Sequence, residues 1–328
     1  MKEAQRFNSK ERCRSWYGWI KDDNVRMESS SGGAFTAMAD IVLAKDGVVI
    51  GAYFDPDIKI IKHASSDTVP IERMRKSKYV ESDMSDAPKL INSALANGRT
   101  VLFCGTPCQC SAIRKCFGNT KDLILCDFFC HGVPSSRVFK DFLEFKEHKK
   151  KSRIIDYQFR TKDFGWSQHG IRTEYENGRL EKTVGRCEFY FTATMLDNLF
   201  LRKCCYTCDK AMYHDSDFTI GDFWGINKLG SIGCDDKGIS ILISNTPYGD
   251  ELIPQLSESM ELHAMEKQYI DYAFKVKTVD RQLENRDKKF NEYNKNGIVA
   301  FTKKHYRKRL FLSRLVFLLK KNKLKAKE

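Results

Sequence analysis

Four of the twelve cysteines in this chain stand in local sequences that set them apart from the others. They are Cys108 in Gly-Thr-Pro-Cys-Gln, Cys130 in Cys-His-Gly, and Cys205 and Cys208 in Cys-Tyr-Thr-Cys. Only Cys205 and Cys208 are near neighbours, so the other two must approach from distant turns of a folded domain. Four thiolates that converge from three segments form a soft, four-coordinate site, which suits an iron–sulfur cluster or a zinc ion.

Cys108 and Cys130 each follow an apolar run that is predicted to be a buried strand. The order strand, turn, short helix and strand predicts a partly parallel sheet, and open sheets of this kind bind ligands at the carboxyl ends of their strands. We therefore expect Gly105 and Thr106 at a cofactor-binding edge, with the two cysteines at adjacent strand ends. Two ordinary core cysteines are the alternative, because free cysteine is often buried.

The pair Cys205 and Cys208 is by itself open to zinc, iron–sulfur or disulfide chemistry. A thioredoxin-type redox motif follows a strand of a βαβ unit, whereas a predicted helix and Lys203 precede this pair. Zinc usually takes two local pairs of ligands, and this chain has one. Cys204 is a candidate to replace Cys205 as a ligand.

A run of three serines and two glycines precedes a predicted helix at residue 34. Here Ser30 and Ser31 can cap the helix, while Gly32 and Gly33 let the backbone approach a ligand closely. The free N–H groups of the first helical turn and the helix dipole favour a phosphate. The alternative is a plain helix cap after a turn; the run is neither a Walker loop nor a dinucleotide-binding glycine motif.

The remaining pattern alternates helix and strand and then changes character. Helices are predicted over 34–44, 87–96 and 190–200, and strands over 47–54, 100–104, 123–128, 154–160, 171–175, 218–222 and 240–244. We expect an α/β fold: a mixed, partly parallel sheet with helices, an inserted strand-rich subdomain and a C-terminal basic helix. The predicted parts are a lead-in 1–28, a main domain 29–264 with the insertion 151–200, and a helical region 265–328.

The net charge of +13 is concentrated in the tail, since residues 302–328 carry +10 of it. The body is nearly balanced, so we expect no nucleic-acid partner. The tail alternates basic and apolar residues, which fits a helix on an anionic membrane surface, a docking helix for an acidic partner, or a solvated terminal helix. The first 25 residues contain no apolar signal segment, and no apolar run is long enough to span a bilayer. We expect a cytoplasmic protein, peripheral to the membrane if the tail binds lipid.

Seven motifs occur in an order that resembles the beta-subunit family of coenzyme F420 hydrogenases and dehydrogenases. They are SSSGGAF (29–35), RKSKYVESD (75–83), GTPCQ (105–109), CHG (130–132), FRTKDFGW (159–166), CYTC (205–208) and TIGDFWG (219–225). Each is modest alone, but the ordered set is specific and spans about two thirds of the chain.

The resemblance implies an oxidoreductase that carries FAD beside a [4Fe–4S] cluster and exchanges electrons with a soluble carrier, with coenzyme F420 as a candidate co-substrate. It implies that the cluster is held by the four cysteines chosen above on chemical grounds, Cys108, Cys130, Cys205 and Cys208. It further implies that the turn from Ser30 to Gly33 and the segment Ser77, Lys78 and Tyr79 contact the flavin.

The chain departs from the family pattern in two places. Many relatives begin with a ferredoxin-like domain, whereas Cys13 is the only cysteine before residue 104. Electrons are therefore expected from a separate donor such as a ferredoxin, or directly from a reductant at the flavin. Lys76 stands where a glycine is expected.

Relatives also occur beside surface-polysaccharide synthesis, which suggests that setting here. Two other hypotheses stay open: a zinc-stabilised interaction module, and a thiol–disulfide oxidoreductase that uses Cys205 and Cys208.

Overall fold

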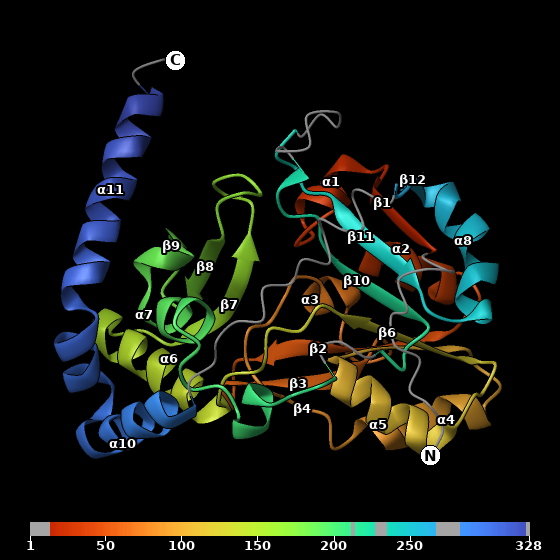
Figure 1. Cartoon of the computed structure of the whole chain (residues 1–328), viewed down its shortest axis with the longest axis horizontal. Coiled ribbons are helices and arrows are strands. Elements are labelled where there is room, and N and C mark those ends of the chain that lie inside the picture. Colours follow the sequence, from red (N-terminus) through yellow and green to blue (C-terminus); the bar gives the residue numbers. More distant parts are fainter. Residues whose placement is uncertain (1–13, 211–213, 227–234, 267–282, 326–328) are drawn as a thin grey trace.

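A computed structural model of the chain describes residues 14–210, 214–226, 235–266 and 283–325. Within them, a nine-stranded sheet runs in the order β12-β1-β11-β10-β6-β5-β2-β3-β4, and a smaller sheet runs β7-β8-β9 (Figure 1). The strands of the large sheet are β1 (Ser15–Ile20), β2 (Val48–Asp55), β3 (Ile60–Ser65), β4 (Ser82–Asp83), β5 (Val101–Cys104), β6 (Leu123–Phe128), β10 (Phe218–Asp222), β11 (Ser240–Ser244) and β12 (Met260–Ala264). The predicted α/β class is confirmed.

The centre of the large sheet is parallel, with β2, β5, β6 and β10 side by side. Alternate residues of these strands enter two different cores, which is why the strands read as continuous apolar runs. In β5, for example, Leu102 packs on one face, while Val101 and Phe103 pack on the other. The first face carries α2 (Ala34–Leu43) and α8 (Pro247–Ser259), and the second carries α4 (Ala87–Ala96) and α5 (Pro107–Phe117).

Antiparallel strands extend the sheet on both sides of this parallel centre. β11 pairs with β10 and with β1, and β1 pairs with β12. On the other side β3 pairs antiparallel with β2 and parallel with the two-residue β4. The predicted lead-in 1–28 thus contributes β1 to the sheet, together with the short helix α1 (Asp23–Met27).

The inserted region forms its own small antiparallel sheet. Its strands are β7 (Ile154–Thr161), β8 (Gly170–Tyr175) and β9 (Leu180–Val184), and the long helix α6 (Ser136–Lys150) precedes them. An aromatic core joins α6 and this sheet to α10 (Leu283–His305), which is kinked at Gly297, and to the start of α11 (Arg307–Lys325). The predicted helical region 265–328 thus contains α10 and α11, while residues 267–282 and 326–328 lie outside the described part.

The helix predicted over 190–200 is wrong in its second half. A single α turn, α7 (Phe189–Phe191), passes into a π-helical turn at Thr192–Leu196. Asn198 and Phe200 then take left-handed backbone angles, φ 54° and 65°. Asparagine tolerates that region better than most residues, so the chain can leave the helix here and turn toward the cysteine pair. None of the helices in the described ranges is both long and apolar enough to cross a bilayer.

Candidate functional site

Two of the cysteine segments are held side by side by main-chain hydrogen bonds. The amide of Arg202 donates to the carbonyl of Val133 at 3.0 Å, and the amide of Ser135 donates to the carbonyl of Phe200 at 2.9 Å. An isolated bridge between Pro134 and Leu201 joins the same stretches. The loop after Cys130 is thereby aligned with the segment that enters the Cys-x-x-Cys pair.

The third cysteine segment reaches the same place through the sheet. β5 and β6 are parallel neighbours, and the Gly105 amide donates to the Cys126 carbonyl at 3.1 Å. Thr106 caps α5 in a reciprocal capping box with Gln109, which fixes the first turn that carries Cys108. The Thr106 hydroxyl lies 3.2 Å from the Cys108 sulfur. Cys108 and Cys130 therefore stand at adjacent strand ends, as predicted.

The four thiols converge on Cys130. Burial raises the pKa of Cys130 to about 12; a hydrogen bond from the Gly132 amide opposes this shift, and negative charge on Cys108, Cys205 and Cys208 adds to it. This influence on Cys130 requires that the other three sulfurs lie in its neighbourhood. Burial also raises the pKa of Cys205, opposed by a hydrogen bond from the Val133 main chain.

The burial of Cys130 and Cys205 fits metal-bound thiolates better than isolated thiols. A buried thiol whose pKa is raised stays protonated at neutral pH unless a cation stabilises the thiolate. Among the described residues, no three His, Cys, Asp or Glu side chains are gathered closely enough to hold a single metal ion.

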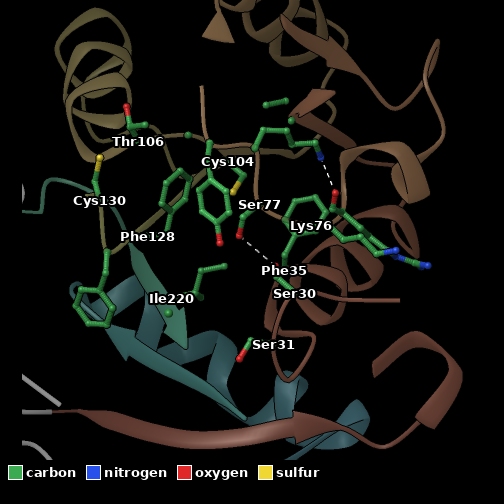
Figure 2. Close-up of a pocket in the computed structure, with 18 of the residues that line it drawn as sticks. Ser30, Ser31, Phe35, Lys76, Ser77, Cys104, Thr106, Phe128, Cys130 and Ile220 are labelled. Carbon is green, nitrogen blue, oxygen red and sulfur yellow. Dashed lines mark hydrogen bonds between the residues drawn. The ribbon is translucent and has the colours of Figure 1, made fainter. Parts of the chain in front are cut away.

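A cavity of about 380 Å³ adjoins the cysteine site, within the range of roughly 300–1,000 Å³ usual for ligand pockets. Its lining includes eight of the nine residues predicted to bind the cofactor: Ser30, Ser31, Gly33, Ser77, Lys78, Tyr79, Gly105 and Thr106. Cys130 also lines it. Figure 2 shows Cys130 and Thr106 on one side of this pocket, Ser30, Phe35 and Lys76 on the other, and Phe128, Cys104 and Ser77 between them.

The ninth predicted residue, Gly32, lies behind the pocket wall. Its amide donates to the Ser240 hydroxyl at 2.9 Å, and a Cβ there would stand 2.3 Å from the Gly18 carbonyl oxygen. Gly32 is thus required for close packing against β1. Gly33 lines the pocket, begins α2 with φ 96°, and leaves the first turn of α2 without a side-chain cap. That open turn is able to receive an anionic group.

The predicted flavin segment, Ser77 to Tyr79, forms part of the pocket wall. Lys78 is partly exposed as a whole, but desolvation of its ammonium lowers its pKa to about 7. The ammonium donates to the carbonyls of Met74 at 2.7 Å and Arg75 at 2.5 Å. The hydroxyl of Ser77 lies 3.3 Å from that of Ser30, so the two predicted segments touch. Lys78 therefore positions the loop.

Lys76, where a glycine was expected, has φ 67°. This left-handed conformation gives the physical reason for that expectation, since glycine adopts it without steric cost. The ammonium of Lys76 donates to Glu28 at 2.6 Å and to Gln158 at 2.9 Å, which anchors the strained residue to β7. Arg75 places a positively charged guanidinium at the same pocket wall. This group donates to the hydroxyl of Thr36, in the first turn of α2, at 3.2 Å.

Several residues that line the pocket carry no strong sequence signal. His63 is 4% exposed, its Nε2 lies 3.1 Å from the Cys104 carbonyl oxygen, and its Nδ1 has no hydrogen-bond partner. Cys104, at the end of β5, also faces the cavity. An alternating strand pattern assigns a residue to a face of the sheet, but it cannot show that a face is hollow.

An aromatic stack forms the outer part of the wall. Trp224, which lines the pocket and is 41% exposed, stacks on Trp166 at 4.7 Å and on His169 at 5.3 Å between ring centroids. The guanidinium of the buried Arg160 lies 4.7 Å from the Trp224 ring centroid and donates to His169 Nε2 at 2.8 Å. Burial, reinforced by the charge of Arg160, lowers the pKa of His169 to about 3. The motifs FRTKDFGW (159–166) and TIGDFWG (219–225) therefore contribute to one surface.

The remaining described cysteines divide by their surroundings. Cys110 and Cys126 are fully buried in the two sheet cores, and burial raises the pKa of Cys110 well above its ordinary value. Cys204 is exposed, whereas Cys205 is buried next to the Cys130 loop, so the structure favours Cys205 as the ligand. Cys13 and Cys234 lie outside the described residues.

Comparison with known proteins agrees with this architecture. Residues 98–268 match the sequence profile that describes the C terminus of the coenzyme F420 hydrogenase/dehydrogenase beta subunit. Among solved structures, a chain of the F420-reducing [NiFe] hydrogenase complex from Methanosarcina barkeri, studied by xenon derivatization, has a similar fold with a TM-score of 0.50. The two chains are 16% identical, and the similarity covers 87% of this chain and 93% of the other. Among curated protein sequences, none matches significantly. The profile match spans just over half of the chain and includes all four converging cysteines, and the protein accordingly belongs to the coenzyme F420 hydrogenase/dehydrogenase beta-subunit family.

Proposed function

We propose that this protein is an iron–sulfur flavoprotein oxidoreductase that passes electrons between a [4Fe–4S] cluster, FAD and a soluble carrier. Its family indicates a redox function of the F420 hydrogenase beta-subunit type. One observation carries the finer proposal: Cys130 belongs at once to the group of four converging thiols and to the wall of the pocket. A cluster and a planar cofactor would then be neighbours, as electron transfer requires.

The cluster would be held by Cys108, Cys130, Cys205 and Cys208. The two buried thiols, Cys130 and Cys205, have raised pKa values because burial disfavours their anionic forms. A polycationic iron core supplies the compensating charge that burial demands, while amides such as that of Gly132 donate to the cysteine sulfur. These amide hydrogen bonds and this burial would tune a cluster bound there.

The pocket fits a cofactor with an anionic part and a planar, apolar part. The open first turn of α2, Ser30 and Arg75 would hold the diphosphate of FAD. The apolar side chains nearer to Cys130, Phe128 and Cys104, would border the isoalloxazine ring. When bound there, FAD supplies the conversion between single-electron and hydride chemistry. The protein's part is to orient the ring and to exclude water from it.

The electron carriers are further parts of the proposal. The similar hydrogenase complex is named for reducing F420, and we extend this to the present chain as the candidate soluble co-substrate. The exposed aromatic surface of Trp224 at the pocket is suited to a second planar ring. A separate iron–sulfur protein such as a ferredoxin would supply or remove electrons at the cluster. The surface-polysaccharide setting stays a prediction.

Anaerobic purification tests the proposal directly. We expect a brown protein with about four irons and about one FAD per chain. Cys130→Ser should lose most of the iron, because a serine hydroxyl is a poor ligand for the cluster. Cys116→Ser is the matched control, since Cys116 is exposed on α5 away from the four converging thiols and should keep the wild-type iron content.

Other results would replace the proposal with one of its rivals. A colourless protein with about one zinc per chain would indicate the structural zinc module. A metal-free protein in which Cys205 and Cys208 form a reversible disulfide would indicate a thiol–disulfide enzyme, and Cys108→Ser would leave that couple intact.

A further inference from the structure

The last helix, α11, presents an unusual apolar face to solvent. This face consists of Phe311, Leu312, Leu315, Val316, Leu318 and Leu319, which are between 44% and 65% exposed. In Figure 1, α11 stands at the edge of the molecule beyond the three-stranded sheet, on the opposite side from α4 and α5. A soluble protein seldom leaves so many neighbouring large apolar side chains in water unless the surface binds something.

The opposite side of α11 is attached to the body, which fixes the direction of the apolar face. Leu310 is 6% exposed in the aromatic core, the Phe317 ring packs on Phe164 at 5.1 Å, and Arg314 donates to the Cys187 carbonyl at 3.2 Å. Because residues three and four apart share a side of a helix, these anchors define the inner side. Residues one and two positions further along, such as 311 and 312, must point sideways and outward.

The charged side chains of α11 are all positive. Residues 307–325 contain eight Lys or Arg residues and no Asp or Glu. Arg307, Lys308 and Arg309 are exposed at the first turn, and the tail beyond residue 319 adds further lysines by sequence. Arg309 is paired with Asp197 at 2.6 Å, whereas the surplus of positive charge on α11 as a whole is uncompensated within the helix.

We propose that α11 is an interfacial helix that attaches this protein to an anionic phospholipid bilayer. Apolar side chains would enter the boundary between headgroups and acyl chains, and the basic residues would contact the lipid phosphates. At 1.5 Å per residue, the 19 residues of α11 extend about 28 Å along the surface. This inference does not depend on the cofactors.

The charge pattern distinguishes the bilayer from other occupants. A second copy of the chain packed through the same face would bring two strongly basic helices together, at an electrostatic cost. A nucleic acid would satisfy the cations but leave six apolar side chains in water. An anionic bilayer satisfies both features at once.

Vesicle co-sedimentation of the full-length holoprotein tests the proposal. We expect binding to vesicles of phosphatidylglycerol and phosphatidylcholine, little binding to phosphatidylcholine alone, and marked weakening at about 0.5 M NaCl. The triple variant Phe311→Ser, Leu315→Ser and Leu318→Ser should bind the anionic vesicles roughly a hundredfold more weakly, because three apolar anchors are removed. Arg307→Gln/Lys308→Gln should weaken it by roughly tenfold or more.

Matched variants separate the helix from general surface properties. Ile58→Ser/Ile155→Ser/Leu180→Ser removes three exposed apolar side chains elsewhere, and Lys89→Gln/Lys121→Gln removes two exposed charges far from α11. Both controls should bind as wild type does, and unchanged circular dichroism should show that all variants are folded.

Four results would overturn the proposal. Equal binding to neutral and anionic vesicles would remove the role of charge, and equal losses in the control variants would remove the role of α11. A dimer that the triple apolar variant abolishes would identify a second copy as the occupant. Binding to soluble polyglutamate or RNA as tight as to the vesicles would show that a bilayer is not required.

Discussion

The half-buried histidine beside Trp224, His169, predicts a specific loss of stability in acid. His169 Nε2 accepts a hydrogen bond from Arg160, so the ring must be neutral at this nitrogen. Burial, and then the charge of Arg160, lowers the pKa of His169 from 6.5 to about 3. Between these two values the unfolded chain binds a proton that the folded chain does not, and the folded state is stabilised by rising pH.

The size of the effect follows from that difference in pKa. Each pH unit between the two values changes the free energy of unfolding by about 1.4 kcal/mol. We therefore expect His169 alone to remove about 2 kcal/mol of stability as the pH falls from about 6.5 to about 5. The full loss would be about 5 kcal/mol and would be complete about one pH unit below the folded pKa of about 3.

Urea unfolding of the wild type and of His169→Gln, at about pH 7 and about pH 5, measures this contribution. Glutamine keeps an acceptor for Arg160 and cannot titrate, so the variant should lose about 2 kcal/mol less than wild type over this range. His148→Gln, at an exposed histidine on α6, is the control and leaves the buried ring in place. If His169→Gln and wild type lost the same free energy between these pH values, His169 would not be held neutral in the folded protein.

Two further predictions concern backbone conformation in the pocket wall, and urea unfolding measures both. Gly33→Ala should destabilise the protein by about 1–3 kcal/mol more than Gly98→Ala, since both glycines have positive φ but only the first would place a Cβ 2.7 Å from Ile20; equal losses would contradict the clash. Gly33→Ala should also lower the FAD content of the purified protein, which flavin absorbance reports. Both Lys76→Gly and Lys76→Ala lose the ion pair with Glu28. Lys76→Gly should nevertheless be about 1 kcal/mol more stable than Lys76→Ala, because glycine adopts the φ of 67° without steric strain. No difference between these two variants would show that the left-handed conformation is not strained.

Much of the central sheet was predictable because its signals are local. The strand at residues 123–128 and the helix at 87–96 have the predicted bounds, since a buried parallel strand is a continuous apolar run and the helix ends at Asn-Gly. The π-helical turn at Thr192–Leu196 was missed, because its i→i+5 bonding is imposed by packing around Phe191 and Leu199. β1 and β12 were missed because each is defined mainly by its partner strand.

By itself the sequence determined which chemical groups this protein can use. These are soft thiolate ligands in three marked segments, a glycine turn before a helix, and a tail with an excess of positive charge. The tertiary structure decided which of these act together. Hydrogen bonds from Arg202 to Val133 and from Gly105 to Cys126 bring the cysteine segments to one place, and packing leaves a cavity beside Cys130. The convergence of the cysteine segments and the formation of the cavity depend on contacts between residues distant in the chain, and no local sequence pattern encodes such contacts. The same holds for α11, whose composition indicates amphipathic character but whose exposed side depends on the anchors at Leu310 and Phe317.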